Sequence, residues 1–379
     1  MTGCGVQSPV GLGVSAFWES LIAGRSALRP LARSWAADLV PNVAGEVAWS
    51  DGDLDRAGAL ALRAADEAMR EAGLDPTSAD AERLGVALGT TLGGMAIFEA
   101  WAAAGGPVPG IEQVPYYAPA VRLARRYGVR GPVATPQLAC ASGTHAVALA
   151  ASWIRAGHAD VVLAGGTDLL CRFVVAGFNC LRATSDAARP FDVRRKGLVL
   201  GEGAAVLVIE SEAHAAARGA RVLARVTGVG AAADAVHMTA PDREGAGAAR
   251  AMRAALDDAG RTPGDVGFVS AHGTGTPYND AMEAVALGRV FAAGAVPVNS
   301  IKGAIGHTLG AAGALEAVVC VRVLATGVVP PTAGLDEIDP ACAALDLVHG
   351  SARQVRARTV LSTSSGFAGA NAALVLEAP

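Results

Sequence analysis

The segment "PQLACASGTHAVALAASWIRAG", residues 136–157, joins a cysteine to a run of small and apolar residues with a helical pattern. A second segment, "GAAGALEAVVCVRVLATG" at 310–327, repeats this plan. With a shift of 170 residues, Gly143 lies over Gly313 and Gly157 over Gly327. Two similar halves predict a duplicated fold with pseudo-two-fold symmetry and one buried central helix in each half. The alternative is a chance likeness, since helices rich in alanine and glycine resemble one another.

Short apolar strands alternate with alanine-rich helical patterns along the rest of the chain, which indicates α/β layering. No long linker, charge run or low-complexity segment divides the chain, so two loosely tethered domains are not expected. The predicted strands are 84–91, 160–168, 204–210 and 266–273, and the predicted helices are 54–72, 143–156, 247–259, 280–291 and 311–325.

Composition excludes several classes of protein. The 379 residues are 52% hydrophobic and carry a formal net charge of −4, which gives no electrostatic support for nucleic-acid binding. No uninterrupted apolar run reaches the length that spans a bilayer, and the N-terminus lacks a signal-peptide pattern. The six cysteines are scattered without paired spacing, which argues against disulfides and a metal site. We expect a soluble cytoplasmic protein with reduced thiols.

Cys140 precedes the first glycine-bounded helix, and it has two interpretations. A helix N-terminus favours a thiolate, and the small neighbours would let a substrate approach closely. The alternative is a small buried hydrophobic residue, which is the interpretation we give to the other five cysteines.

Three further segments carry residue types that composition does not require. His272 lies where a predicted strand enters the loop "AHGTGTPYNDAME" (271–283), although an ordinary turn explains that loop as well. Lys302 and His307 lie in "NSIKGAIGHTLGAAGALE" (299–316), where a buried lysine needs a partner such as Glu316 and an exposed lysine needs none. The third is "STSSGFAGANAALVLE" (362–377), whose backbone N–H groups could bind an anion.

One cysteine, two histidines and one lysine, each at a strand–loop–helix junction, form the distribution expected of a nucleophile with acid–base partners. The other histidines lack this setting and are interpreted as surface or packing residues, with His237 the least secure of them.

Several motifs in order resemble those of the elongating, Cys-His-His β-ketoacyl-acyl-carrier-protein synthases. They run from "TGCGVQSPVG" through "RPFDVRRKGLVLGEGAAVLVIE", "DAVHMTAP" and "HGTGTPYND" to "GFAGAN", so the resemblance covers nearly the whole chain. It implies a thiolase-like α/β fold of five layers, α-β-α-β-α, built from two pseudo-repeated halves. We expect residues 1–228 to carry the nucleophile, and residues 229–379 to carry the histidines and the lysine.

The same resemblance implies roles for the site residues. Cys140 takes the acyl chain as a thioester, and His272 and His307 bind the malonyl thioester carbonyl and promote decarboxylation. Lys302 structures the site, with Glu316 as its ion-pair partner.

Other roles implied by the resemblance concern the walls of the site. Phe367 matches an aromatic gate, and its N–H with that of Cys140 would form an oxyanion hole. Thr274 and Thr276 match hydroxyls that contact the phosphopantetheine arm of an acyl carrier protein. Asp280 and Glu283 are expected to hold the His272 loop in shape. No tightly bound cofactor and no metal are implied.

Departures from the family pattern concern access to the site. Alanines at 368 and 370 replace a glycine and a threonine that are usual in the gating loop, and Leu138 replaces a common threonine. Phe98 and Tyr117 fall where residues of the pocket wall are expected.

The basic residues usual after 94–104 are absent from "GGPVPGIEQVPYY". For docking an acidic carrier we therefore expect Arg194, Arg195 and Lys196 instead.

The resemblance leaves several functions open. A non-catalytic chain-length-factor subunit would lack the cysteine, whereas a catalytic subunit could form a homodimer or pair with such a factor. The departures favour a polyketide pathway, aromatic or polyene, over housekeeping fatty-acid synthesis. A degradative thiolase requires a second catalytic cysteine, and a CoA-primed initiating synthase requires an asparagine for one histidine, so Lys302 with His307 disfavours both.

Overall fold

A computed structural model describes residues 1–49, 55–75, 80–106 and 109–379. Its two large sheets have six strands each. The first sheet has the order β2-β1-β9-β7-β5-β6, with β2 Gly11–Leu12, β1 Gly3–Ser8, β9 Gly203–Glu210, β7 Val161–Asp168, β5 Leu84–Gly89 and β6 Val133–Ala134. The second has the order β10-β17-β16-β11-β12-β14, with β10 Arg225–Ala233, β17 Ala370–Glu377, β16 Thr359–Gly366, β11 Phe268–Ser270, β12 Pro297–Asn299 and β14 Asp346–Leu347.

The two sheets repeat one pattern of strand directions. In the first, β1 pairs antiparallel with β9, β9 antiparallel with β7, and β7, β5 and β6 run parallel. In the second, β10, β17 and β16 pair antiparallel, and β16, β11 and β12 run parallel. This confirms the two similar halves predicted from the repeated segments.

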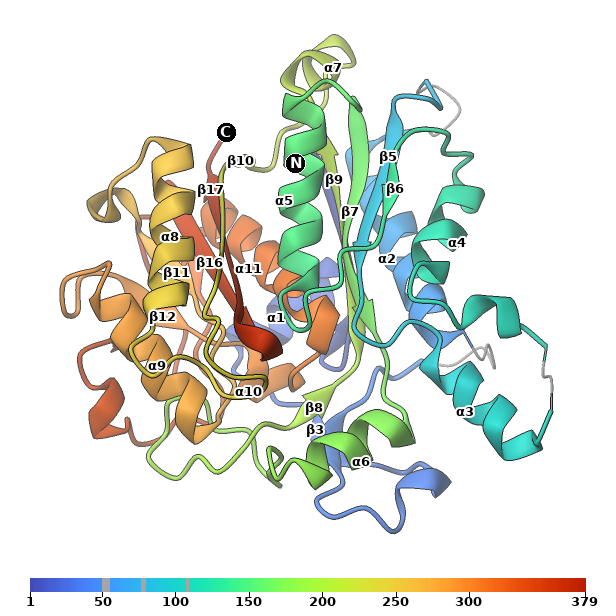
Figure 1. The fold of residues 1–379 in the computed structure, drawn as a ribbon. Coiled ribbons are helices and arrows are strands. Elements are labelled where there is room, and N and C mark those ends of the chain that lie inside the picture. The colour runs from blue at the N-terminus through green and yellow to red at the C-terminus, as the bar shows by residue number, and fades with distance from the viewer. Residues whose placement is uncertain (50–54, 76–79, 107–108) are drawn as a thin grey trace.

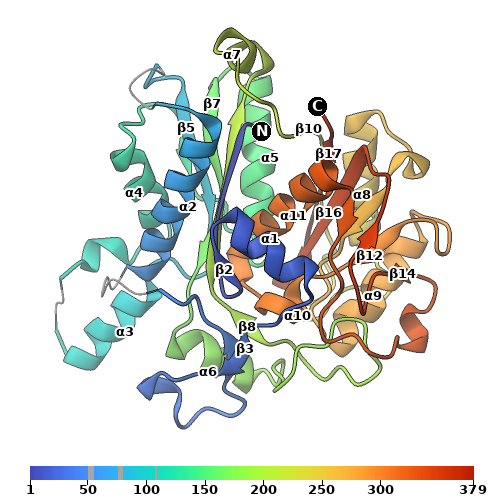
Figure 2. The same ribbon diagram turned by 180° about the vertical axis from the view of Figure 1, so that it is seen from behind.

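Helices separate and cover the two sheets in five layers (Figure 1). The central layer is made by α5 and α11, which contact each other and lie between the two sheets, touching both of them. One outer layer packs on the first sheet and the other on the second, as the view from behind also shows (Figure 2). The helices are α5 Ser142–Arg155 and α11 Ala312–Thr326 in the centre, α2 Arg56–Ala72 and α4 Ala118–Arg126 on one side, and α8 Ala246–Ala259 and α9 Pro277–Gly288 on the other.

The two central helices cross at the glycines that the sequence repeat aligned. A Cβ atom on Gly143 would lie 2.7 Å from the carbonyl oxygen of Gly310, and one on Gly313 would lie 1.9 Å from the Thr144 hydroxyl. The crossing therefore depends on two positions without side chains.

Smaller elements lie beneath the layers, at the end where the site forms (Figures 1 and 2). They include α3 Met95–Ala104, α6 Arg172–Cys180, α10 Lys302–Ile305, and the three-stranded sheet of β3 Leu28–Pro30, β4 Val43–Gly45 and β8 Leu200–Gly201. The other α-helices and β-strands of the described residues are α1 Val14–Ile22, α7 Glu212–Ala217, β13 Val328–Val329 and β15 Arg353–Gln354.

Most predicted elements are present with ends shifted by a few residues. The strand predicted at 266–273 is only Phe268–Ser270, because the chain leaves the sheet there to form the His272 loop. The helix predicted at 280–291 begins at Pro277, since the Thr276 hydroxyl accepts from the N–H of Asn279 and caps it. Residue 54, the first of one predicted helix, lies outside the described residues.

The expected boundary between the halves, at 228/229, falls within β10, whose first residue, Arg225, already pairs in the second sheet.

The helical segment Leu309–Thr326 is long and apolar enough for a bilayer by length and composition, although Glu316 and Arg322 interrupt its run of apolar residues. Of this segment, 78% is buried inside the protein, between the two sheets, which suits a core helix.

Candidate active site

Cys140 lies in a tight turn just before α5. The N–H groups of Ala141 and Ser142 donate to the carbonyl oxygens of Leu138 and Ala139. The Ser142 hydroxyl accepts from the N–H of Leu138 and donates to the carbonyl oxygen of Ala139, which closes the start of the turn. Ala139 has a φ of 49°, a left-handed conformation that costs an alanine about 1–2 kcal/mol. The turn thus directs the cysteine toward the other half of the fold.

Cys140, His272 and His307 line one cavity of about 300 Å³. The cysteine comes from the first half, and the histidines follow β11 and α10 of the second half. Thr274, Thr276, Lys196 and Phe367 line the same cavity, so the structure brings together most of the site residues that the sequence predicted.

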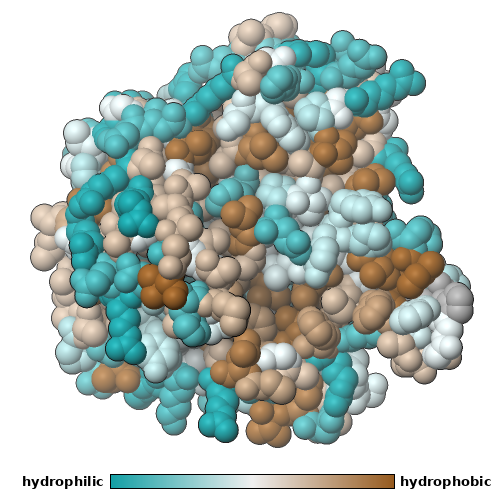
Figure 3. Space-filling view, in the orientation of Figure 1, coloured by the Kyte–Doolittle hydropathy of each residue, from teal (hydrophilic) through white to brown (hydrophobic). Residues whose placement is uncertain are grey.

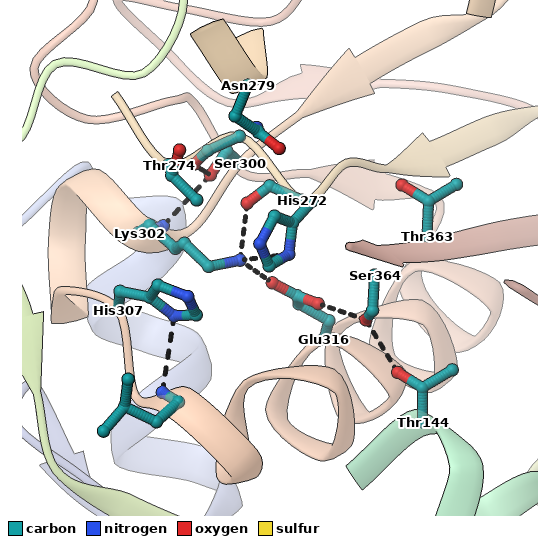
Figure 4. Close-up of polar contacts among 12 residues, drawn as sticks. Thr144, His272, Thr274, Asn279, Ser300, Lys302, His307, Glu316, Thr363 and Ser364 are labelled. Carbon is teal, nitrogen blue, oxygen red and sulfur yellow. Dashed lines mark hydrogen bonds and ion pairs between the residues drawn. The ribbon is translucent and has the colours of Figure 1, made fainter. Parts of the chain in front are cut away.

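Both histidines are held as the tautomer with hydrogen on Nε2. The backbone N–H of Leu309 donates to Nδ1 of His307 at 3.3 Å, and the ammonium of Lys302 lies 3.3 Å from Nδ1 of His272 (Figure 4). Because an ammonium and a backbone N–H can only donate, each Nδ1 accepts and each Nε2 carries the proton. The rings lie edge to face with centroids 5.2 Å apart, so the site holds two neighbouring N–H donors.

Lys302 is buried and pairs with Glu316 as predicted. Its ammonium also donates to the carbonyl oxygen of His272. Glu316 accepts from Ser364 at 3.4 Å, and the hydroxyls of Ser364 and Thr144 bond at 2.7 Å, which extends the network to α5 (Figure 4). Lys302 lies behind His272 and does not line the cavity, so it is a positioning residue.

Burial controls the charges of the site residues. It raises the pKa of Cys140 to about 12, while Lys302 opposes this shift. Of the two interpretations of Cys140, burial therefore opposes the thiolate, and a helix N-terminus offsets it by only about 0.3–2 kcal/mol. Burial lowers the pKa of both His272 and His307, and Lys302 adds to this effect, so both rings are neutral at pH 7.

Two buried carboxylates hold the loop that carries His272. Glu283 accepts from the N–H groups of His272 and Gly273 at 2.6 and 2.7 Å, and Asp280 accepts from those of Thr274 and Gly275. Burial raises the pKa of Glu283 to about 7. Both carboxylates are where the sequence interpretation placed them, supporting the loop.

Phe367 lies at the cavity wall and stacks on Phe178 of α6, with ring centroids 5.6 Å apart. The next residue, Ala368, has a φ of 63°, so an alanine occupies the left-handed conformation at the position where the family pattern has glycine. Its N–H donates to the carbonyl oxygen of Met238, which ties this loop to the segment after β10.

Two predicted pocket residues lie elsewhere. Phe98 and Tyr117 are 43% and 60% exposed and do not line the cavity that contains Cys140. Phe98 stacks on Trp101 on the outer surface of α3. Phe98 lies on α3, outside the layers, and Tyr117 directly precedes α4, so neither borders this cavity within one chain. Their role at the pocket wall stays a prediction.

The predicted docking residues are mostly engaged within the protein. Arg194 pairs with Asp192 and Asp336, and the Arg195 side chain, 6% exposed, pairs with Asp339. Two of these acidic partners lie more than 140 residues away in sequence, so no local pattern indicates the pairing. Lys196 is exposed at the cavity and fits a docking role.

Sequence reasoning missed several residues of the cavity. Only the fold shows that Phe178 and Arg182 line the cavity, because neither α6 nor the turn after it carries a sequence motif that would mark them. His237 does not line the cavity, but its Nδ1 accepts from the N–H groups of Thr239 and Ala240, which do. The other cavity residues missed are Leu181, Ala183, Gly197, Leu198, Asp234, Pro241, Pro277, Tyr278, Asn279, Ser365, Gly366 and Asn371.

No group of three or more His, Cys, Asp or Glu side chains within the described parts of the chain could hold a metal ion. The cavity offers hydroxyls from Thr274 and Thr276, which suit a polar, flexible arm such as phosphopantetheine.

Comparisons with known proteins agree with this geometry. The family model "Beta-ketoacyl synthase, N-terminal domain" matches residues 1–215, and "Beta-ketoacyl synthase, C-terminal domain" matches 223–336. The tetracenomycin polyketide synthase ketoacyl synthase alpha subunit of Streptomyces glaucescens is 40% identical over all of this chain and 96% of its own length.

Two solved structures are similar over the whole chain and 98% of their own. The ishigamide ketosynthase/chain length factor has a TM-score of 0.93 at 37% identity. A type II polyketide synthase ketosynthase, AntDE, in complex with its acyl-carrier protein AntF, has a TM-score of 0.93 at 32% identity.

A five-layered duplicated fold with a buried cysteine facing two histidine donors defines a thiolase-fold condensing enzyme, which is an acyltransferase. With both family models matched in order along the chain, this protein belongs to the β-ketoacyl synthase family.

Proposed function

We propose that the chain catalyses decarboxylative Claisen condensation between an acyl chain on Cys140 and malonyl-acyl carrier protein. The observation that carries this proposal is the pair of neutral Nε2–H donors beside one buried thiol. An oxyanion needs donors that are already in place, and two neutral imidazoles supply them without a metal.

In the first step, the sulfur of Cys140 attacks the thioester carbonyl of an acyl carrier protein. The new sulfur–carbon bond forms, the bond to the pantetheine sulfur breaks, and the cysteine proton ends on the leaving thiol. Since burial keeps Cys140 protonated in the free enzyme, the proton leaves only as the acyl donor enters. The N–H groups of Cys140 and Phe367 are our candidates for the oxyanion hole, and Gly366 allows the two segments to approach closely.

In the second step, malonyl-acyl carrier protein loses CO₂, and the electron pair of the broken carbon–carbon bond forms an enolate. The enolate oxygen accepts from His272 and His307, and removing one such donor typically costs about 10²- to 10³-fold in rate. The carbanion carbon attacks the acyl carbon, the bond to the Cys140 sulfur breaks, and the sulfur takes up a proton from water. The product is a β-ketoacyl chain on the carrier.

In this proposal each half of the fold contributes different catalytic groups. Residues 1–228 supply the nucleophile, and residues 229–379 supply the two histidine donors and Lys302. Carrier docking falls to Lys196 and Arg182, which are exposed and line the cavity. Both cations suit an acidic carrier protein, and Arg194 and Arg195 support the loop beside them instead.

A second subunit of the same fold is proposed to cover the outer face of α3 and the segment that follows it. Exposed apolar side chains gather there, and brown surface marks this edge at the right of Figure 3. The members of this apolar face are Phe98, Trp101, Ile111, Tyr116 and Tyr117. Homologous structures include ketosynthase/chain length factor pairs, so a heterodimer or a homodimer in the cytoplasm fits the chain, in a polyketide or fatty-acid-like pathway.

The test offers the purified chain an acyl-carrier protein and measures the intact mass. We expect an acyl adduct on the wild type and on Cys180→Ala, an exposed cysteine, and none on Cys140→Ala. An adduct that persists on Cys140→Ala would overturn the nucleophile assignment.

The histidines are tested by the next step. His272→Ala and His307→Ala should still accept the acyl chain but release CO₂ from malonyl-acyl carrier protein about 10²- to 10³-fold more slowly. A wild-type chain that forms no adduct, alone or with a partner subunit, would favour the non-catalytic chain-length-factor alternative.

A further inference from the structure

Asp168, at the end of β7, is a fully buried carboxylate that the condensation mechanism does not use. It accepts from four donors: the Thr90 hydroxyl at 2.8 Å and the N–H groups of Thr91, Leu92 and Gly310 at 2.6–3.1 Å. Within the described parts of the chain, no lysine or arginine pairs with it. A buried carboxylate bound only by neutral donors is costly, so its presence needs a reason.

The donors connect Asp168 to the nucleophile turn. Thr91, whose N–H binds Asp168, donates its hydroxyl to the carbonyl oxygen of Ala139 at 3.4 Å. Ala139 is the left-handed residue directly before Cys140. A strained residue keeps its conformation only where the surroundings hold it, and Thr91 is one of the contacts that do so here.

The same carboxylate fixes the start of the second central helix. Oδ2 of Asp168 binds the N–H of Gly310, whose carbonyl oxygen lies against Gly143 on α5 and Gly166 on β7. A Cβ atom on Gly310 would lie 2.7 Å from Oδ2, so the contact leaves no room for a side chain. One carboxylate therefore holds the loop after β5, the start of α11 and, through Thr91, the turn of Cys140.

The negative charge of Asp168 opposes the ionisation of the Cys140 thiol. Lys302 lowers the pKa of the Cys140 thiol, whereas Asp168 and Glu316 raise it. An anion at this position works against a thiolate, so the advantage of Asp168 lies in its geometry.

We propose that Asp168 is a positioning residue that aims Cys140 at the histidine donors by clamping the turn before it and the start of α11. The condensation assay that tests this proposal rests on the proposed function. The alkylation assay of the Cys140 thiol needs no carrier protein or malonyl substrate, so the Asp168 proposal and the proposed function can fail separately.

The test compares Asp168→Asn and Asp168→Glu with wild type in two assays. Asp168→Asn removes the charge and turns one acceptor into a donor, so condensation should fall about 10- to 100-fold through misalignment. The same variant should react with iodoacetamide at Cys140 faster at pH 7, by up to about tenfold, because the opposing charge is gone. Asp168→Glu keeps the charge and should keep the wild-type pH profile of alkylation.

The matched control is Glu210→Gln, at the other end of the same strand pair. Glu210 is also a buried carboxylate, bound by Arg218 and Thr2 and far from Cys140 along β7 and β9. This variant should lose thermal stability but keep condensation per folded molecule and the alkylation profile. If Asp168→Asn behaves in the same way, the carboxylate only stabilises the fold and the proposal fails. If wild-type condensation is absent but Asp168→Asn changes the alkylation of Cys140 and Glu210→Gln does not, the proposed function fails and the link between Asp168 and the Cys140 turn stands.

Discussion

The ammonium of Lys302 interacts with two groups, the carboxylate of Glu316 and Nδ1 of His272. It balances the buried charge of Glu316, and it lies against Nδ1 of His272 so that the ring presents Nε2–H to the cavity. The first effect belongs to stability and the second to catalysis, so substitutions can separate them.

Lys302→Met should lower the free energy of unfolding by about 3–5 kcal/mol, because Glu316 is left as an unpaired buried charge. The double variant Lys302→Met/Glu316→Gln should recover part of that loss, as measured by urea unfolding. Both variants should lack condensation activity, since His272 loses the donor that fixes its tautomer.

An exposed ion pair provides the comparison. Arg289 pairs with Glu244 at 2.8 Å on the surface, and Arg289→Met should cost less than about 1 kcal/mol. A double variant at 302 and 316 that is as unstable as Lys302→Met would contradict the account of the buried pair.

At the residue scale, the types of residue in the site could be predicted from the sequence, whereas their burial and their distant partners could not. The cysteine, the histidines and the Lys302–Glu316 pair were found because their types and junction positions are unusual for an apolar chain. The protonated state of Cys140 was not found, because burial depends on residues far away in sequence. The engagement of Arg194 and Arg195 was missed for the same reason.

At the scale of elements, α5 and α11 pack closely because each has a glycine, which has no side chain, where the two helices cross. Gly143 and Gly313 lie at their crossing, each against the other helix. The repeat in the sequence predicted two central helices, and the structure adds that the aligned glycines are their contact.

Gly313→Ala should destabilise the protein by about 1–3 kcal/mol, because its Cβ would lie 1.9 Å from the Thr144 hydroxyl oxygen. Adding Thr144→Ala should recover part of the loss by removing that hydroxyl. Thermal unfolding measures both effects.

Gly288→Ala is the control for helix propensity. Gly288 lies at the end of α9, and no atom lies within 4 Å of the place that its Cβ would take, so alanine there should be neutral or slightly stabilising. Equal effects at 288 and 313 would show that the crossing tolerates a side chain.

Element types were predictable because apolar periodicity and glycine boundaries are local signals. Strand β11 was predicted too long, since only the pairing of Phe268–Ser270 with β12 and β16 decides where it ends. Sheet order was not predictable from periodicity alone, and the layered fold followed from the family resemblance.

At the scale of the whole molecule, the apolar face over α3 is where an assembly would form. A stable interface buries about 800 Å² on each partner, with aromatic residues at its centre. Phe98 and Trp101 stack there with exposed side chains, which is more typical of a face that a partner subunit covers than of a face that stays in water.

Trp101→Asp should shift the protein toward monomer in sedimentation velocity and lower condensation activity in parallel. Val285→Asp, an exposed apolar residue on α9 in the second half, should change neither. Unchanged association of Trp101→Asp would move the interface to another surface.

The two histidine tautomers have a consequence for inhibitors. With both imidazoles neutral and Lys302 matched by Glu316, the two rings present uncharged hydrogen-bond donors, and the exposed cations Lys196 and Arg182 lie elsewhere on the cavity wall. A bound compound should then gain affinity as electron density builds on one oxygen held between the two Nε2–H groups, and stable enol or enolate mimics meet that need. Amines and other cations would find no acceptor on either ring, so compound libraries for this enzyme should be weighted toward acidic carbonyl compounds.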